Sequence, residues 1–255
     1  MRIRTRRIEA AAKRLRARLQ LVPWLPGGPD QLRPSDFRDL RVIVIGPAET
    51  VTEDLEGTDV DSYDVVVRLN NGLMLSEAQP DVLGRRTDVL FHNLREEGER
   101  SAGAIPASRL NALGVGMVVY PHWRNRRLRD LYWAKRAELG RDGGPPVRIV
   151  PPRMTDRIRR AIGDRPPTVG TSAVMFFLDC PIAELAIHGF TFFETAYASG
   201  YNPAVRTGAE ARAWVDARGA HEPLSEKAAL RRRLEAPHRP EVVLGRHVRR
   251  HLYQD

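Results

Sequence analysis

Cysteine is nearly absent from this chain: Cys180 is the only one among 255 residues. A single cysteine excludes a disulfide within the chain and any zinc site built from several cysteines, and it favours a reducing compartment. Apolar runs are also short, because none reaches the roughly 20 residues that a membrane-spanning helix needs. The basic start is not followed by the apolar run of a secretory signal. We therefore expect a cytoplasmic protein.

Acidic residues are fewer than basic ones, and the formal net charge is +9 at pH 7. This balance suits an anionic partner, and an acidic sugar nucleotide, an anionic membrane surface and a nucleic acid are all compatible with it. Residues 1–22 place apolar side chains on one helical face among arginines, which predicts a basic amphipathic helix. Two interpretations stay open for this helix: peripheral binding at the inner face of the plasma membrane, and packing on the rest of the protein.

Proline and glycine are concentrated in residues 23–36, which predicts a linker before a globular domain over residues 37–255. In that domain, short β-branched runs alternate with helical patterns. Strands are expected at residues 42–45, 65–69, 88–92, 115–120, 147–150 and 185–188. Helices are expected at residues 128–139, 155–162, 172–178 and 209–217. The alternation predicts a single α/β domain, Rossmann-like, with a mainly parallel sheet covered by helices on both faces.

Two separated stretches have the features of a phosphate site. The β-branched run of residues 41–45 ends in Gly46, the pattern of a buried strand that feeds a loop whose backbone can approach a ligand closely. Gly170, Thr171 and Ser172 stand at the expected start of an apolar helix. Unpaired N–H groups and the helix dipole favour an anion at such a position. The alternative for the second stretch is a capped helix start without a ligand.

Three motifs follow one another along residues 41–235. The first joins the strand before Gly46 with Asp61-Ser-Tyr-Asp64, Arg68-Leu-Asn70, Gly84-Arg-Arg-Thr87 and Phe91-His-Asn93. The second is Pro167-Thr-Val-Gly170, an apolar helix, Cys180 and Leu185-Ala-Ile-His-Gly-Phe190. The third is His221-Glu-Pro-Leu-Ser-Glu226, a histidine and a glutamate with four residues between them. In order and spacing they resemble the large, small and very small sialylmotifs of the eukaryotic-type sialyltransferases.

The resemblance implies a bacterial-type member with a variant of the glycosyltransferase A fold. It implies a CMP-sugar as donor substrate, carrying sialic acid or a related acidic keto-sugar, and a glycan or glycolipid hydroxyl as acceptor. It also implies inversion at the anomeric carbon, with no metal and no cofactor. His221 is then the general base. Donor binding would fall to residues of the three motifs: Gly46, Asn70, Asn93, Thr168, Gly170, Thr171, Ser172 and Glu226.

Elementary chemistry supports His221 as a base. Pro223 suits the first position of a helix that runs toward Leu234, so His221 stands just before the positive end of that helix. This position favours a neutral imidazole, which can take a proton from an attacking hydroxyl. The alternative is an exposed loop histidine beside a helix start. Arg68 also has two interpretations, an ionic partner of the donor or an internal structural residue.

The chain departs from the family pattern in places. Pro47 stands where the family usually has an asparagine, and Cys180 has no partner for the disulfide of secretory-pathway members. The family's short third motif is not clear, and Tyr197 or Tyr201 is the candidate for its place.

Other classes of protein remain in competition with this interpretation. Asp59-Val-Asp61 has the Asp-x-Asp form that holds a metal in many glycosyltransferases, but it precedes a strand instead of closing one. Asp61 and Asp64 also suit local hydrogen bonds to backbone N–H groups. Within enzymes, the rival donor is a CMP-activated eight-carbon keto-sugar acid of the Kdo type for a surface polysaccharide. A non-catalytic basic protein would bind nucleic acid with a strong salt dependence. That interpretation is disfavoured because it leaves the Gly-Thr-Ser helix start and the spacing of His221 and Glu226 unexplained. A dehydrogenase is disfavoured because no Gly-x-Gly-x-x-Gly follows the first strand.

Overall fold

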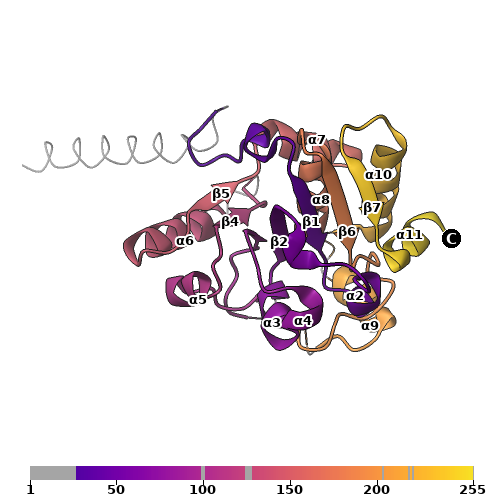
Figure 1. Ribbon diagram of the computed structural model, residues 1–255, viewed down its shortest axis with the longest axis horizontal. Coiled ribbons are helices and arrows are strands. Elements are labelled where there is room, and N and C mark those ends of the chain that lie inside the picture. Colours follow the sequence, from indigo (N-terminus) through magenta and orange to yellow (C-terminus); the bar gives the residue numbers. More distant parts are fainter. Residues whose placement is uncertain are drawn as a thin grey trace, which may run out of the picture.

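The protein is seen in a computed structural model that describes residues 27–98, 101–123, 128–202, 204–217, 219 and 221–254. These residues form a seven-stranded sheet in the order β5-β4-β3-β2-β1-β6-β7, and every neighbouring pair is parallel (Figure 1). The strands are β1 (Arg41–Ile45), β2 (Val65–Leu69), β3 (Val89–Phe91), β4 (Met117–Tyr120), β5 (Val147–Ile149), β6 (Glu184–His188) and β7 (Glu241–Leu244). The predicted α/β class with a parallel sheet is confirmed.

Helices connect the strands and cover the sheet (Figure 1). They are η2 (Pro34–Phe37), α2 (Val51–Asp54), η3 (Val60–Ser62), α3 (Gly72–Ala78), α4 (Pro80–Leu83), α5 (Ala107–Ala112), α6 (Arg129–Arg141), α7 (Pro152–Ala161), α8 (Val169–Leu178), α9 (Gly208–Asp216), α10 (Pro223–Glu235) and α11 (Arg246–Tyr253). The six predicted strands and the four predicted helices are present. β7 was not predicted: it is an edge strand paired with β6 among the described residues, and only its alternate positions are partly buried.

Helix α8 is the centre of the core. All ten of its residues are buried, which explains why its sequence from Ala173 to Leu178 is apolar on every side. Phe177 packs edge-on against Phe37 at 5.1 Å between ring centroids and against Phe91 of β3 at 6.3 Å. The helix is therefore fixed between the sheet and the segment that precedes β1, so its N-terminal turn has a defined position.

The described part of the predicted linker packs on the sheet. Asp30, Gln31 and Leu32 are buried, and Leu32 N–H donates to the carbonyl of Ile149 in β5 at 2.9 Å. The Asp30 carboxylate accepts a hydrogen bond from Tyr132 of α6 at 2.7 Å. Residues 28–37 thus lengthen the domain at the β5 edge. The predicted amphipathic helix of residues 1–22 lies outside the described residues.

Arg68 of β2 is an internal structural residue. Its side chain is 1% exposed and donates to the carbonyls of Leu83 at 2.6 Å and Gly84 at 3.0 Å, and to Thr87 Oγ1 at 3.0 Å. Burial lowers the pKa of Arg68 to about 10, and the nearby Asp61 and Asp88 oppose this shift. The guanidinium therefore stays charged at neutral pH and ties the α4–β3 connection to the sheet.

The aspartates around β2 also serve the fold. Asp61 Oδ1 accepts from the backbone N–H groups of Arg85 and Arg86, each at 3.0 Å, and Asp64 Oδ2 accepts from Arg41 N at 2.8 Å. Bonds of these aspartates to backbone N–H groups were predicted, and they are confirmed. The Asp61 carboxylate of the Asp-x-Asp pair is thus engaged by the loop before β3.

His92, directly after β3, is fully buried and makes two fixed hydrogen bonds. Its Nε2–H donates to the carbonyl of Ala102 and its Nδ1 accepts from Leu94 N, both at 3.0 Å, so the ring is held neutral. Burial lowers the pKa of His92 from its usual 6.5 to about 4.

Because the folded-state pKa of His92 lies below the unfolded one, its contribution to stability is complete above about pH 6.5 and is lost as the pH falls toward 4. We expect this residue to reduce the free energy of unfolding by about 2 kcal/mol between pH 7 and pH 5. Urea unfolding at the two pH values measures the change. His92→Gln should show a smaller pH dependence, and equal pH dependence in both proteins would contradict the assignment.

No helix in the described part of the chain is both long and apolar enough to cross a membrane.

Candidate functional site

A cavity of about 1040 Å³ opens at the carboxyl ends of the strands. It is lined by the residues that follow five of them: Pro47 after β1, Asn70 after β2, Asn93 after β3, His122 after β4 and Gly189 after β6. The strand order reverses between β1 and β6. The chain first adds β2 to β5 on one side of β1 and then returns to add β6 and β7 on the other side. Open parallel sheets bind ligands at such a switch point. The cavity is therefore the candidate site.

Gly46 and Gly189 shape this switch point by their close approach, although only Gly189 lines the cavity. A Cβ on Gly46 would collide with the carbonyl oxygen of Gly189, and a Cβ on Gly189 would lie 2.5 Å from the Gly46 carbonyl oxygen. The two backbones can approach only because neither residue has a side chain. Gly46 does not line the cavity, so its close packing against Gly189 explains why this residue is a glycine.

His221 lines the cavity from the residue before the N-cap of α10. Its Nδ1 lies 2.8 Å from the carbonyl oxygen of Pro166. A carbonyl only accepts, so Nδ1 carries the proton and donates. In the neutral ring the lone pair is then on Nε2, the form that a general base needs. The predicted helix from Pro223 is confirmed, and it positions His221 as expected.

Glu226 is buried beneath His221 and is held by the start of α8. Its Oε1 accepts from Thr168 N at 2.9 Å, and its Oε2 accepts from the hydroxyls of Thr168, at 2.6 Å, and Thr171. Burial raises the pKa of Glu226, while His221 and the threonine donors act in the opposite direction. His221 Nδ1 lies 3.9 Å from Glu226 Oε1, close enough for the carboxylate to stabilise an imidazolium.

The N-terminal turn of α8 offers backbone donors to the cavity. The Thr168 hydroxyl caps the helix by accepting from Thr171 N at 3.1 Å, as the capping interpretation predicted. The hydroxyls of Thr168 and Thr171 also donate to Glu226. The N–H groups of Val169 and Gly170 have no acceptor among the described residues. A Cβ on Gly170 would lie 2.8 Å from the ring of Phe190. The donors left free here are thus backbone N–H groups, because the hydroxyls of Thr168 and Thr171 are engaged by Glu226.

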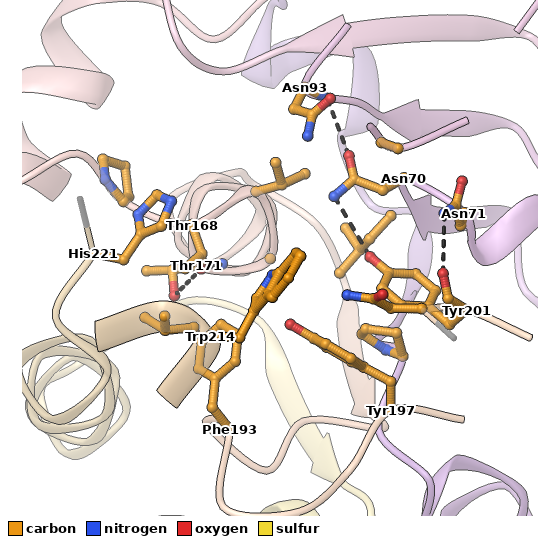
Figure 2. Close-up of a pocket in the computed structure, with 18 of the residues that line it drawn as sticks. Asn70, Asn71, Asn93, Thr168, Thr171, Phe193, Tyr197, Tyr201, Trp214 and His221 are labelled. Atoms are coloured by element: carbon orange, nitrogen blue, oxygen red, sulfur yellow. Dashed lines mark hydrogen bonds between the residues drawn. The ribbon is translucent and has the colours of Figure 1, made fainter. Parts of the chain in front are cut away.

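Asn70 and Asn93 face the cavity from the ends of two neighbouring strands (Figure 2). Asn70 has a left-handed backbone, with φ of 47°, which asparagine adopts more readily than most residues. Its Oδ1 accepts from Asn93 N at 3.0 Å, and its Nδ2 lies 3.5 Å from the Tyr201 hydroxyl. The pair joins the ends of β2 and β3 and lines the cavity there.

Two of the predicted positions do not face the cavity. Ser172 is 2% exposed and donates back to the Thr168 carbonyl at 2.8 Å, within α8. Gly46 packs on Gly189, as described above. Asp59 and Asp61 are likewise absent from the cavity lining. The structure brings together His221 with the remaining predicted donor residues: Asn70, Asn93, Thr168, Gly170, Thr171 and Glu226.

Several lining residues were not predicted as site residues. His122 lies 6.4 Å from His221 between ring centroids, and burial lowers its pKa to about 3, helped by the repulsion from His221 and Arg95. Arg159 lines the cavity from α7, and its Nε is buried without a partner among the described residues. Aromatic side chains form the remaining wall, notably Phe193, Tyr197, Tyr201 and Trp214 (Figure 2). Of these aromatic residues, only Tyr197 and Tyr201 were named from the sequence, as candidates for the family's short third motif.

Comparisons with known proteins give structural similarity only. No family model matches the chain, and no curated protein matches it. A mammalian sialyltransferase in complex with Gal-β-1-3GalNAc-ortho-nitrophenol is 20% identical over 82% of this chain and 70% of that chain, with a TM-score of 0.49. The sialyltransferase CstII from Campylobacter jejuni, in complex with a substrate analogue, CMP-3FNeuAc, is 12% identical over 75% of each chain, with a TM-score of 0.44.

Proposed function

We propose that the protein is an inverting glycosyltransferase that moves sialic acid, or a related acidic keto-sugar, from CMP to a glycan hydroxyl without a metal. The observation that carries the proposal is the meeting, in one cavity, of His221 with the free N–H groups of Val169 and Gly170. These residues come from two of the three motifs that resemble sialylmotifs. The choice of CMP as the nucleotide follows from that resemblance.

In the proposed reaction, His221 Nε2 takes the proton of the acceptor hydroxyl while the hydroxyl oxygen attacks the anomeric carbon of the donor sugar. The bond between that carbon and the phosphate oxygen breaks on the opposite face, and CMP leaves with the electron pair. Glu226, 3.9 Å from His221 Nδ1, stabilises the imidazolium that forms. The N–H groups of Val169 and Gly170 and the dipole of α8 offset the charge on the leaving phosphate. Asn70 and Asn93 hold the nucleotide.

Titration calorimetry with nucleotides tests this proposal. We expect the full chain to bind CMP without added metal, and to bind it at least about tenfold more tightly than UDP or GDP. Magnesium or manganese should leave the CMP affinity unchanged. Binding of UDP or GDP only with metal would instead support a metal-dependent transferase. Absence of any nucleotide binding would favour the non-catalytic basic protein.

A further inference from the structure

The segment that follows β6 lines the cavity with a strained backbone. This segment, residues 189–202, is called the cavity loop, and it includes Phe193, Tyr197 and Tyr201 (Figure 2). Phe192 and Phe193 have φ values of 51° and 64°, left-handed conformations that residues other than glycine rarely adopt. Such conformations persist only where the surrounding structure holds them, and they cluster at functional sites. The contacts beside these two residues therefore fix the shape of the cavity.

Glu194, the next residue, is held by three helices. Its carbonyl oxygen packs against Gly208, the first residue of α9, where a Cβ would collide with it. Its carboxylate accepts hydrogen bonds from Lys227 of α10 at 3.0 Å and from His251 of α11 at 2.7 Å. Burial raises the pKa of Glu194, but the hydrogen bonds from these two side chains and the charge of Lys227 lower it further, to below its ordinary value. The carboxylate is therefore ionised at neutral pH.

Lys227 connects this carboxylate to the part of α10 that carries the proposed base. His221 stands two residues before Pro223, the first residue of the helix. Glu226, directly before Lys227, binds the start of α8. Two successive residues of α10 thus tie the helix to α8 and to the cavity loop. The ion pair between Glu194 and Lys227 sets the spacing between the loop and the base.

Helix α11 holds the cavity loop at its beginning as well. The helix packs beside α2, which carries Asp54 (Figure 1). The Asp54 carboxylate accepts from His247 N, in the first turn of α11, at 2.7 Å and from Gly189 N at 2.9 Å. Because His251 of the same helix binds Glu194, α11 is tied to both ends of the strained stretch.

We propose that Glu194 is a positioning residue, which acts through Lys227 and His251. The inference rests on the proposed transferase function and adds to it a residue that does not itself line the cavity. The carboxylate keeps the cavity loop at a fixed distance from α10, so that substrates in the cavity meet His221 in the orientation for attack. A misplacement of reacting groups by about 1 Å can lower a rate about 10²-fold.

Kinetics and calorimetry on the full chain test this role. CMP release from CMP-sialic acid, with methyl β-galactoside present, measures kcat, and titration with CMP measures affinity. Glu194→Ala should lower kcat at least about tenfold and leave the CMP affinity within about twofold. Glu194→Gln can still accept one of the two hydrogen bonds and should lose less. Unchanged kcat in Glu194→Ala, or an equal loss of CMP affinity, would overturn the proposal.

Hydrogen exchange measures the hold on the cavity loop without any substrate. Ala198 N–H donates to the Pro47 carbonyl at 2.8 Å, and Tyr201 N–H donates to the Ala198 carbonyl at 3.0 Å. In Glu194→Ala we expect both amides to exchange at least about tenfold faster, and the amides of β1 to be unchanged. Equal acceleration in β1 would show a general loss of stability and contradict the proposal, as would unchanged exchange in the loop. A wild-type chain without CMP binding or CMP release would contradict the transferase, while these amides would still decide whether Glu194 holds the loop.

A double-mutant cycle tests whether Glu194 acts through Lys227. Lys227→Met removes the cation at similar size, and the double variant should be no slower than Glu194→Ala because both changes remove one contact. Losses of kcat that multiply would contradict this route. Glu235→Ala is the matched control, because it removes an exposed ion pair with Arg231, 3.0 Å long, at the other end of α10. It should change neither kcat nor loop exchange, and a loss of kcat equal to that of Glu194→Ala would overturn the proposal.

Discussion

His221→Ala should lower kcat about 10²–10⁴-fold and leave the affinity for CMP within about twofold. The size of the loss is that of a general base, which acts on the acceptor proton in the transition state. Affinity should be retained because the proposed function assigns the nucleotide to the start of α8 and to Asn70 and Asn93, not to the imidazole. Turnover with a CMP-sugar donor and calorimetry with CMP, on the same preparation, measure the two quantities.

His221→Asn is the matched control for this experiment. An asparagine amide can replace the Nδ1–H bond to the Pro166 carbonyl, which is 2.8 Å long in the wild type, but it is not a base. We therefore expect His221→Asn to be as inactive as His221→Ala and to keep its stability. A nearly active His221→Asn protein, or an equal loss of turnover and CMP affinity in both variants, would show that His221 is structural. An inactive His122→Ala with an active His221→Ala would move the base to His122.

Arg68→Met should lower the free energy of unfolding by about 3–5 kcal/mol. Two buried acceptors, the carbonyls of Leu83 and Gly84, and the partly buried carbonyl of Arg86 would lose their donor. Each unsatisfied buried group costs about 1–3 kcal/mol before the structure relaxes. Single domains are stable by only about 5–15 kcal/mol, so the variant should unfold at a much lower urea concentration.

The control for Arg68 separates a structural role from a ligand role. Arg68→Lys keeps the charge but lacks the planar fork, so it should satisfy fewer carbonyls and lose an intermediate amount of stability. At low temperature, the folded fraction of both variants should bind CMP with the affinity of the wild type. Unchanged stability with weaker CMP binding would assign Arg68 to the donor, the alternative that the sequence left open.

Local pattern predicted the elements well because each pattern was long enough to be distinctive. The β-branched runs of β1 and β2 and the apolar run of α8 identify themselves by composition, and Pro223 marks the start of α10. β7 was missed because an edge strand with only two partly buried residues has a weak signal. For the site, the position of His221 beside a helix start also followed from sequence.

What the sequence by itself determined is thus the α/β class, the parallel strands and the set of motif residues. Only the tertiary structure decided which groups of those motifs are free. The hydroxyls of Thr168 and Thr171 donate to Glu226, and Gly46 packs against Gly189. The sequence did not predict these contacts because packing between distant segments has no local signature. The aromatic wall is also a tertiary feature. Residues 189–204 and α9 meet opposite α8 only when the chain returns across β1 to form β6, and no period in the sequence encodes that return.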